Sequence, residues 1–368
     1  MRFEDIPGNE IVKQALVRMA NAGRIPHAVM FHESEGCGAL ALAVAFLQYA
    51  NCKNRGASDS CGICIPCNQI SKLIYPDLYF VFPTAGDKVT SLNYMTQWRE
   101  LFIRNPFFTE NGLYEALGIE KKSCSIAVAE AKNIISELSV SSYSAGSRCV
   151  IIWLPEKMQT EAANRLLKII EEPSDNTLFL FVTHDPEKVL KTIRSRCQII
   201  RVLPATKDQV AKALPRWTGV DSEQAIYAAN FCAGSIGVAI RSLAEKDENV
   251  VMTDTFMALM DAVIARDLLT ALDVGDTLSA LDSREKQKAF CKFASDSVRK
   301  IFMLQKGLPG ISGIRPEDMD FYKETARKCG PDFCTRALKI ISRANSMIAR
   351  NVNQKIIFTN MVSRLFVS

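Results

Sequence analysis

The fold of this chain is decided by residues 28–40, which read AVMFHESEGCGAL. Four apolar residues predict a short buried strand, and the Ala, Leu and Val residues from 39 to Phe46 predict a helix. Between them lies a polar turn with glycines at Gly36 and Gly38. A strand, a glycine-containing loop and a helix in this order form the phosphate-binding unit of P-loop proteins. The stretch therefore predicts a nucleotide-binding type of α/β fold.

The loop lacks the residues that act on nucleotide. A working P-loop ends in Gly-Lys-Ser/Thr, whereas Gly38 is followed by Ala39 and Leu40. Without the lysine no ammonium reaches the β- and γ-phosphates, and without the hydroxyl no side chain of the loop ligates Mg²⁺. We expect a degenerate loop, in which Gly36 and Gly38 keep the shape and no nucleotide is hydrolysed.

A second site has lost its acids as well. In P-loop ATPases a hydrophobic strand ends in carboxylates that hold Mg²⁺. The matching apolar strand here, residues 149–153, runs into Trp153-Leu154-Pro155-Glu156. Glu156 is acidic but lies too far along the chain to take over the metal. Two independent losses predict that this chain is not an ATPase.

Composition restricts the class of protein without naming it. The chain has 368 residues, enough for two or three domains, with 48% hydrophobic and 23% charged residues. No run approaches the roughly 18 apolar residues of a membrane span, and the start MRFED does not resemble a signal peptide. A net charge of +5 is too small to indicate nucleic-acid binding by itself. We expect a cytoplasmic protein without a membrane partner.

Four of the twelve cysteines form a compact array. Cys52, Cys61, Cys64 and Cys67 have the spacing C-x8-C-x2-C-x2-C, which suits a tetrahedral four-thiolate site. Such a site leaves no open coordination position, so its metal is structural. An iron–sulfur cluster is the chemical alternative, because C-x2-C-x2-C also occurs there. We predict structural zinc.

The rest of the chain changes character near residue 204. Before it, apolar strands alternate with helices, which predicts a parallel sheet covered on both faces. Residues 84–124 form a less legible insert to which no function is assigned. After residue 204 only helices are expected, short ones over 206–246 broken by Gly219, Gly234 and Gly237, and then a helical region. The predicted domains are 1–204 with a cysteine module at 50–70, 205–246, and 247–368.

One arginine lies just before the last strand expected in the sheet. Arg196 lies in Ser195-Arg196-Cys197, between a helix and an edge strand. The ordinary interpretation is a structural guanidinium that pairs a carboxylate or carbonyl groups. The alternative is an arginine finger that reaches a γ-phosphate on a neighbouring subunit. Its place after an inactive loop and before a helical region favours the finger.

Ordered motifs along nearly the whole chain resemble one family. The sequence is similar to delta-prime subunits of the bacterial DNA polymerase III clamp loader, which are AAA+ relatives. The matching motifs are Phe3 to Gly8 with Asn9-Glu10, His27-Ala28, the four cysteines, Pro76-Asp77-Leu78, Ala162 to Lys168, Glu171-Glu172-Pro173, Thr192 to Cys197, Gly234 to Ala239, and Asn351-Val352-Asn353. Two departures are Tyr75, where the family usually has His, and the length of the insert.

The resemblance implies an architecture and a set of partners. It implies a RecA-like AAA+ domain, a helical lid and a C-terminal helical collar that joins a pentamer. The partners would be gamma or tau motor subunits and the delta subunit, with the β sliding clamp and primer-template DNA reached through the complex. By the same resemblance, Arg196 is the finger in trans and the four cysteines are zinc ligands.

Two rival functions stay open at this point. The first is an active gamma/tau-like ATPase motor, which Ala39 and Leu40 argue against. The second is a zinc-containing nucleic-acid adaptor unrelated to clamp loading, which the mild charge disfavours. Nucleotide turnover by the chain alone would favour the motor, and salt-sensitive DNA binding by the chain alone would favour the adaptor.

Overall fold

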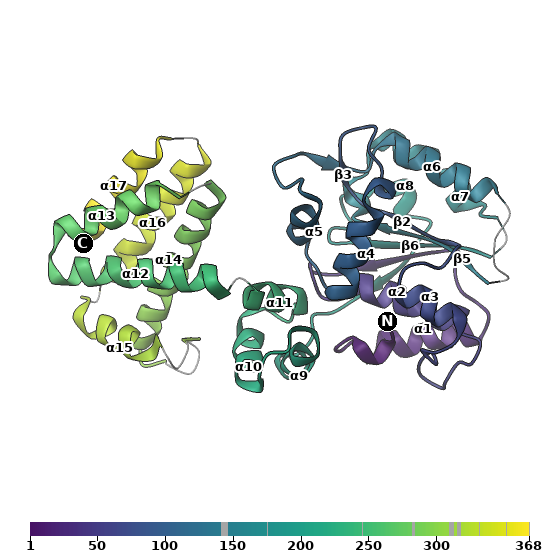
Figure 1. Ribbon diagram of the computed structural model, residues 1–368, viewed down its shortest axis with the longest axis horizontal. Coiled ribbons are helices and arrows are strands. Elements are labelled where there is room, and N and C mark those ends of the chain that lie inside the picture. The colour runs from purple at the N-terminus through teal and green to yellow at the C-terminus, as the bar shows by residue number, and fades with distance from the viewer. Residues whose placement is uncertain are drawn as a thin grey trace. The chain divides into compact units, whose positions relative to one another are not determined.

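The computed structural model describes residues 1–368 except 141–145, 175, 245, 282–283, 309–312, 315–317, 331, 351 and 368. It contains two compact units, residues 1–243 and 244–368 (Figure 1). The first unit holds the sheet together with residues 205–243, so the separate lid expected from the sequence stays a prediction.

The first unit is built on five parallel strands. Their order across the sheet is β2-β5-β6-β1-β7, and every neighbouring pair is parallel. The strand of the P-loop-like unit, β1, therefore lies inside the sheet between β6 and β7. This confirms the P-loop NTPase-like α/β fold. The strands are β1 (Ala28–His32), β2 (Leu78–Val81), β5 (Arg148–Trp153), β6 (Thr177–Thr183) and β7 (Gln198–Arg201).

Both faces of this sheet are covered, as its continuous apolar strands require. Because side chains alternate along a strand, Val29 and Phe31 enter one hydrophobic core and Ala28 and Met30 enter another. Helices α6 and α7 lie over one face, and α1, α2 and α3 lie on the other (Figure 1). These helices are α1 (Glu10–Asn21), α2 (Ala39–Asn51), α3 (Ile65–Ser71), α6 (Val128–Ser139) and α7 (Thr160–Glu171).

The insert predicted over residues 84–124 is ordered and compact. A two-stranded antiparallel ribbon, β3 paired with β4, closes its base, and two helices lie between the strands. Its elements are β3 (Thr84–Ala85), the 3-10 helix η2 (Ser91–Tyr94), α4 (Met95–Arg104), α5 (Glu110–Leu117) and β4 (Cys124–Ser125). The remaining short elements of the sheet region are η1 (Phe3–Asp5), η3 (Pro155–Lys157) and α8 (Lys191–Arg194).

Three helices follow the last strand and pack within the first unit. They are α9 (Lys207–Thr218), α10 (Ser222–Phe231) and α11 (Ile236–Ala244). Gly219 caps α9 in the left-handed region, as expected, but Gly237 lies inside α11 and not at a break. The junction before α9 is held by a residue distant in the sequence. The Asn9 side chain accepts from the Leu203 N–H and donates to the Leu203 carbonyl.

The second unit is entirely helical over its described residues. Its core gathers large apolar side chains from six helices, among them Phe256, Tyr322 and Phe358. The helices are α12 (Lys246–Ala265), α13 (Leu268–Ser279), α14 (Arg284–Gln305), α15 (Met319–Lys328), α16 (Phe333–Ala349) and α17 (Gln354–Val367).

A membrane-spanning helix is not found in the part of the chain that the structure describes. No single helix there is both long and apolar enough, and only the sharply bent pair α10 and α11 passes by length and composition when its two helices are combined.

Candidate functional site

The loop between β1 and α2 has the shape of a phosphate-binding loop. It leaves the carboxyl end of an interior parallel strand, where ligands of open α/β sheets bind. Gly36 and Gly38 both have positive φ, +75° and +102°, a region that favours glycine. Ala39 and Leu40, at the positions of the catalytic lysine and hydroxyl, are buried in the hydrophobic core. Ala39 and Leu40 thus serve as core residues, and the loss of phosphate chemistry at this loop stays a prediction.

A carboxylate of the chain itself lies at the start of α2. Glu33 Oε2 accepts the Ala39 N–H at 2.7 Å, and the Glu33 side chain is only 4% exposed. The free N–H groups at a helix N-terminus favour an anion, which in active P-loops is a phosphate. Counting back five residues from Gly38, Glu33 stands where the P-loop pattern has its first glycine. The sequence analysis missed Glu33, although an acid at that position was a readable signal.

A histidine from the neighbouring strand end completes this contact. His184 Nε2 lies 3.7 Å from Glu33 Oε1. Burial lowers the pKa of His184, but the hydrogen bond to Glu33 and the charges of Glu33, Glu156 and Glu35 outweigh it, so the pKa is raised overall. The buried carboxylate therefore faces both a helix N-terminus and the imidazole ring of His184.

The strand that would carry metal-binding acids ends in an aromatic cluster. Trp153, at the end of β5, is 1% exposed and packs against Trp98, Phe108 and His184. Glu156 is engaged elsewhere, because its two oxygens accept from the Thr183 hydroxyl at 2.7 Å and the His184 N–H at 2.9 Å. Glu156 is thus a structural acceptor.

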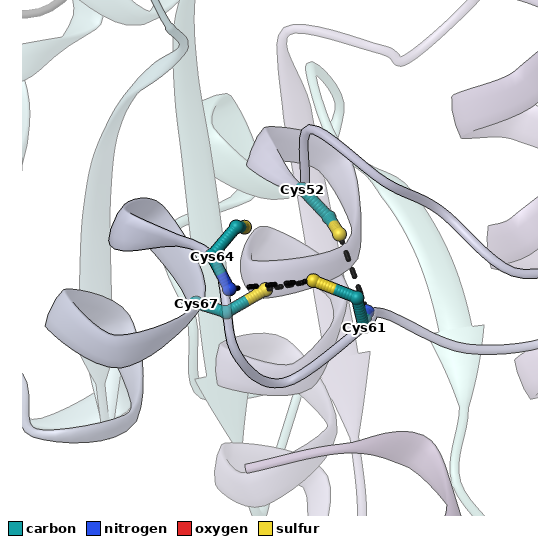
Figure 2. Close-up of side chains that lie close together, drawn as sticks. All are labelled: Cys52, Cys61, Cys64 and Cys67. Atoms are coloured by element: carbon teal, nitrogen blue, oxygen red, sulfur yellow. Dashed lines mark hydrogen bonds between the residues drawn. The ribbon is translucent and has the colours of Figure 1, made fainter.

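The four clustered cysteines converge on one point. Their sulfur atoms all lie within 4.8 Å of one another, and Figure 2 shows the side chains pointing inward. The Sγ atoms of Cys61 and Cys67 are 3.9 Å apart. A tetrahedral site with metal–sulfur bonds of about 2.3 Å has sulfurs about 3.8 Å apart. The arrangement fits a four-thiolate metal site.

Neighbouring backbone groups support this cysteine cluster. The Cys61 N–H donates to Cys52 Sγ at 3.3 Å and the Cys64 N–H to Cys61 Sγ at 3.4 Å (Figure 2). N–H groups of Ile63 and Cys64 lower the pKa of the Cys61 thiol to about 6. Burial raises the pKa of Cys52 and Cys67. A metal cation would supply the positive charge that four adjacent thiolates require.

Arg196 lies far from the loop. Its guanidinium donates to Glu171 Oε2 at 3.0 Å and to the Thr192 carbonyl at 2.9 Å, while its Nε is buried without a hydrogen-bond partner among the described residues. The Arg196 side chain is 30% exposed. It precedes β7, whereas the loop follows the adjacent parallel strand β1, so the two sites lie at opposite edges of the sheet.

This combination defines a class of protein. A five-stranded parallel sheet with a P-loop-shaped turn at an interior strand, followed by helices, is a P-loop NTPase-like, AAA+-like scaffold. The family model described as "DNA polymerase III, delta subunit" matches residues 8–206, more than half of the chain. The chain therefore belongs to this family of clamp-loader subunits.

Curated relatives agree with that assignment. The chain is 27% identical over 227 residues to the DNA polymerase III subunit delta' of Escherichia coli K12, covering 62% of this chain and 57% of that protein. It is 26% identical over 364 residues to the gamma/tau subunit of Mycobacterium bovis, covering 92% and 56%. The chain spans about half the length of the curated relatives it matches.

Among solved structures, a gamma subunit-related protein of Thermotoga maritima aligns over 96% of this chain and 98% of its own, with 15% identity and a TM-score of 0.35.

Proposed function

We propose that this chain is a non-catalytic delta-prime subunit of a cytoplasmic clamp loader. In this role it joins gamma or tau motor subunits and a delta subunit, and presents Arg196 to the ATP site of a neighbour. The complex then loads the β sliding clamp on primed DNA. Family membership and the two altered positions of the loop, Ala39 and Leu40, support a subunit that hydrolyses no ATP itself.

The separation of Arg196 from the loop of its own chain carries this proposal. β7 pairs with β1 so that Gln198 lies beside Val29 and Arg201 beside His32. Along the strand direction the backbone of Arg196 is thus about 20 Å from Glu33, at about 3.3 Å per residue. That distance is far beyond the reach of an arginine side chain. Any nucleotide that Arg196 serves must belong to another molecule.

The local geometry of Arg196 suits such a finger. The guanidinium is partly exposed, with one edge held by Glu171 and Thr192. Glu171 ends α7, where the helix dipole disfavours a carboxylate. A residue that is unfavourable for its helix but bonded to Arg196 fits a positioning role.

The test is ATP hydrolysis by the reconstituted complex of this chain with motor subunits, delta, β clamp and primed DNA. Gel filtration must first show that wild type, Arg196→Ala and Arg196→Lys assemble alike. Fingers contribute on the order of 10³–10⁵ in rate at the site they serve, so we expect Arg196→Ala to remove that site's share of the stimulated hydrolysis. Lysine should not restore it, because it lacks the planar guanidinium.

The other outcomes contradict parts of the proposal. Equal hydrolysis by wild type and Arg196→Ala would make Arg196 structural. Failure of the wild-type chain to join the motor subunits would remove the clamp-loader role. Turnover of Mg²⁺-ATP by the isolated chain would favour the motor function instead.

We also propose that the four cysteines hold Zn²⁺ as a structural ion. A closed four-thiolate set stabilises a fold and leaves no position for substrate. The expected result is about one zinc per chain by elemental analysis, without the visible absorption of an iron–sulfur cluster. Cys67→Ser should lose the zinc and lower the Tm, because structural metal binding is coupled to folding. Iron and sulfide in the purified chain would contradict the zinc assignment.

A further inference from the structure

The insert reaches the degenerate loop across the carboxyl edge of the sheet. Trp98 of α4 is fully buried and stacks on Phe82 just after β2, with centroids 4.2 Å apart and planes 5° apart. The start of η2 is fixed by Glu130, whose buried carboxylate accepts from the Ser91 N–H at 3.0 Å and from the Ser91 hydroxyl at 2.5 Å. The insert is thus anchored on both sides before it turns toward the loop.

The turn between α4 and α5 places Phe107 on the two loop glycines. Phe107 is 1% exposed. A Cβ on Gly38 would lie 3.1 Å from the Phe107 ring, and a Cβ on Gly36 would lie 3.3 Å from the Phe107 carbonyl oxygen. Glycines in a phosphate loop leave room for a ligand to approach the backbone. Here that room is taken by a residue of the same chain.

The next residues of the insert also bind the loop. The Glu110 N–H donates to Glu35 Oε1 at 2.5 Å, and the Glu110 side chain pairs with Lys157 at 2.9 Å. Phe108 packs against Trp153 at the end of β5. The segment Asn105–Glu110 therefore spans from the loop to the position of the lost metal acids.

The start of helix α11 also contacts the loop, at Glu35 and Gly36. The Gly237 N–H donates to the Gly36 carbonyl at 3.0 Å, and the Ser235 hydroxyl donates to the Glu35 carbonyl at 2.7 Å. A Cβ on Gly237 would lie only 1.9 Å from the Phe107 carbonyl oxygen, so no larger residue fits. The Phe107 ring also meets Trp217 of α9 edge to face at 5.5 Å. Phe107 thus contacts the loop, α9 and α11 together.

We propose that the insert is a built-in occupant of the degenerate loop, and that Phe107 joins helices α9–α11 to the loop with no nucleotide bound. The insert, which the sequence left without a function, closes the loop and fixes the three helices on it. The inference rests on contacts within the first unit and not on the role of Arg196. Its failure would leave the proposed clamp-loader function unaffected.

The test is hydrogen–deuterium exchange on the full chain alone, comparing wild type, Phe107→Ala and Ile103→Ala. Ile103 is in the same insert but 56% exposed, so it serves as the matched control. Removing Phe107 should speed exchange in residues 34–39 and 235–240 by about tenfold or more, because local opening there becomes easier. Amides of β1 and β6 should stay protected over the labelling times at which these two segments exchange, because they open only on global unfolding, and exchange in Ile103→Ala should stay at the wild-type rate.

Two results would overturn the proposal. One is unchanged exchange in both segments in Phe107→Ala. The other is loss of protection in β1 and β6 at the same labelling times, which would make Phe107 an ordinary core residue. If Phe107→Ala does not fold, Phe107→Leu is judged by the same criteria, since it keeps apolar volume but loses the ring that meets Trp217 and Gly38.

Discussion

The two edges of one sheet have opposite character in this protein. At the carboxyl edge, the loop glycines, Glu33 and Trp153 are enclosed by partners from the same chain. At the amino edge, Arg196 is partly exposed and held by a single carboxylate and a carbonyl. The loop proposed to have lost its phosphate chemistry is part of the core, while the residue proposed to act on another molecule stays at the surface. Substitutions at the two edges should therefore affect different properties.

The largest effect on stability is expected from Trp153→Ala at the carboxyl edge. The substitution removes a fully buried indole that contacts Trp98 and Phe108, and such truncations cost about 3–5 kcal/mol. Arg196→Ala at the amino edge should change the free energy of unfolding by no more than about 1 kcal/mol, because it breaks a single partly exposed ion pair. Urea denaturation of both variants measures the difference. If the two variants lost similar amounts of unfolding free energy, the proposed difference between the carboxyl and amino edges would be wrong.

Glu33→Gln should have a smaller effect that depends on pH. Glutamine keeps an acceptor for the Ala39 N–H but loses the charge that faces His184, and hydrogen bonds to charged groups contribute about 1.5–3 kcal/mol. The folded-state pKa of His184 is raised, so its contribution is fully present below its unfolded pKa of about 6.5. It is lost as the pH rises through the folded-state pKa.

Urea denaturation at pH 6 and pH 8 measures this effect. Wild type should exceed Glu33→Gln in stability by more at pH 6 than at pH 8. A gap that stays constant or widens toward pH 8 would show that the imidazolium of His184 does not pair with Glu33.

The smallest effect is expected from Glu171→Ala at the amino edge. An exposed ion pair such as Glu171–Arg196 contributes about 0.2–1 kcal/mol, so the free energy of unfolding should hardly change. For the same reason, the stimulated ATP hydrolysis at the neighbouring site that Arg196 is proposed to serve should fall by about fivefold at most. Glu172→Ala is the matched control, because it removes a neighbouring acid from the same helix end. Equal loss from both variants would attribute the effect to charge at that helix end and not to the positioning of Arg196.

Much of the fold could be predicted from residue patterns. Continuous apolar runs such as 149–153 indicated buried parallel strands, and the spacing of four cysteines indicated one cluster, because both depend on residues close in sequence. The occupant of the loop could not be predicted in this way. Phe107 lies about seventy residues from Gly38 in the sequence. The apolar residues that precede it in the insert have the spacing of any helix that packs on a core, so they gave no sign of a contact with the loop.

Glycine shows the same limit. Gly237 suggested a helix break, since glycine weakens helices, but its small size is needed where the Phe107 carbonyl approaches α11. The reason for that residue is a tertiary contact, which no local pattern contains. The role of Glu33 could have been predicted, because its position in the loop pattern is visible in the sequence.

The paired hydrogen bonds between Asn9 and Leu203 have a consequence for synthesis on the ribosome. The two residues are 194 positions apart, so Asn9 cannot make this pair of hydrogen bonds until residue 203 has been made. At roughly 5–20 residues per second this delay is about 10–40 s. During that interval the Asn9 side chain lacks this partner, so the contact that fixes the junction before α9 forms only after all five strands of the sheet have been synthesised.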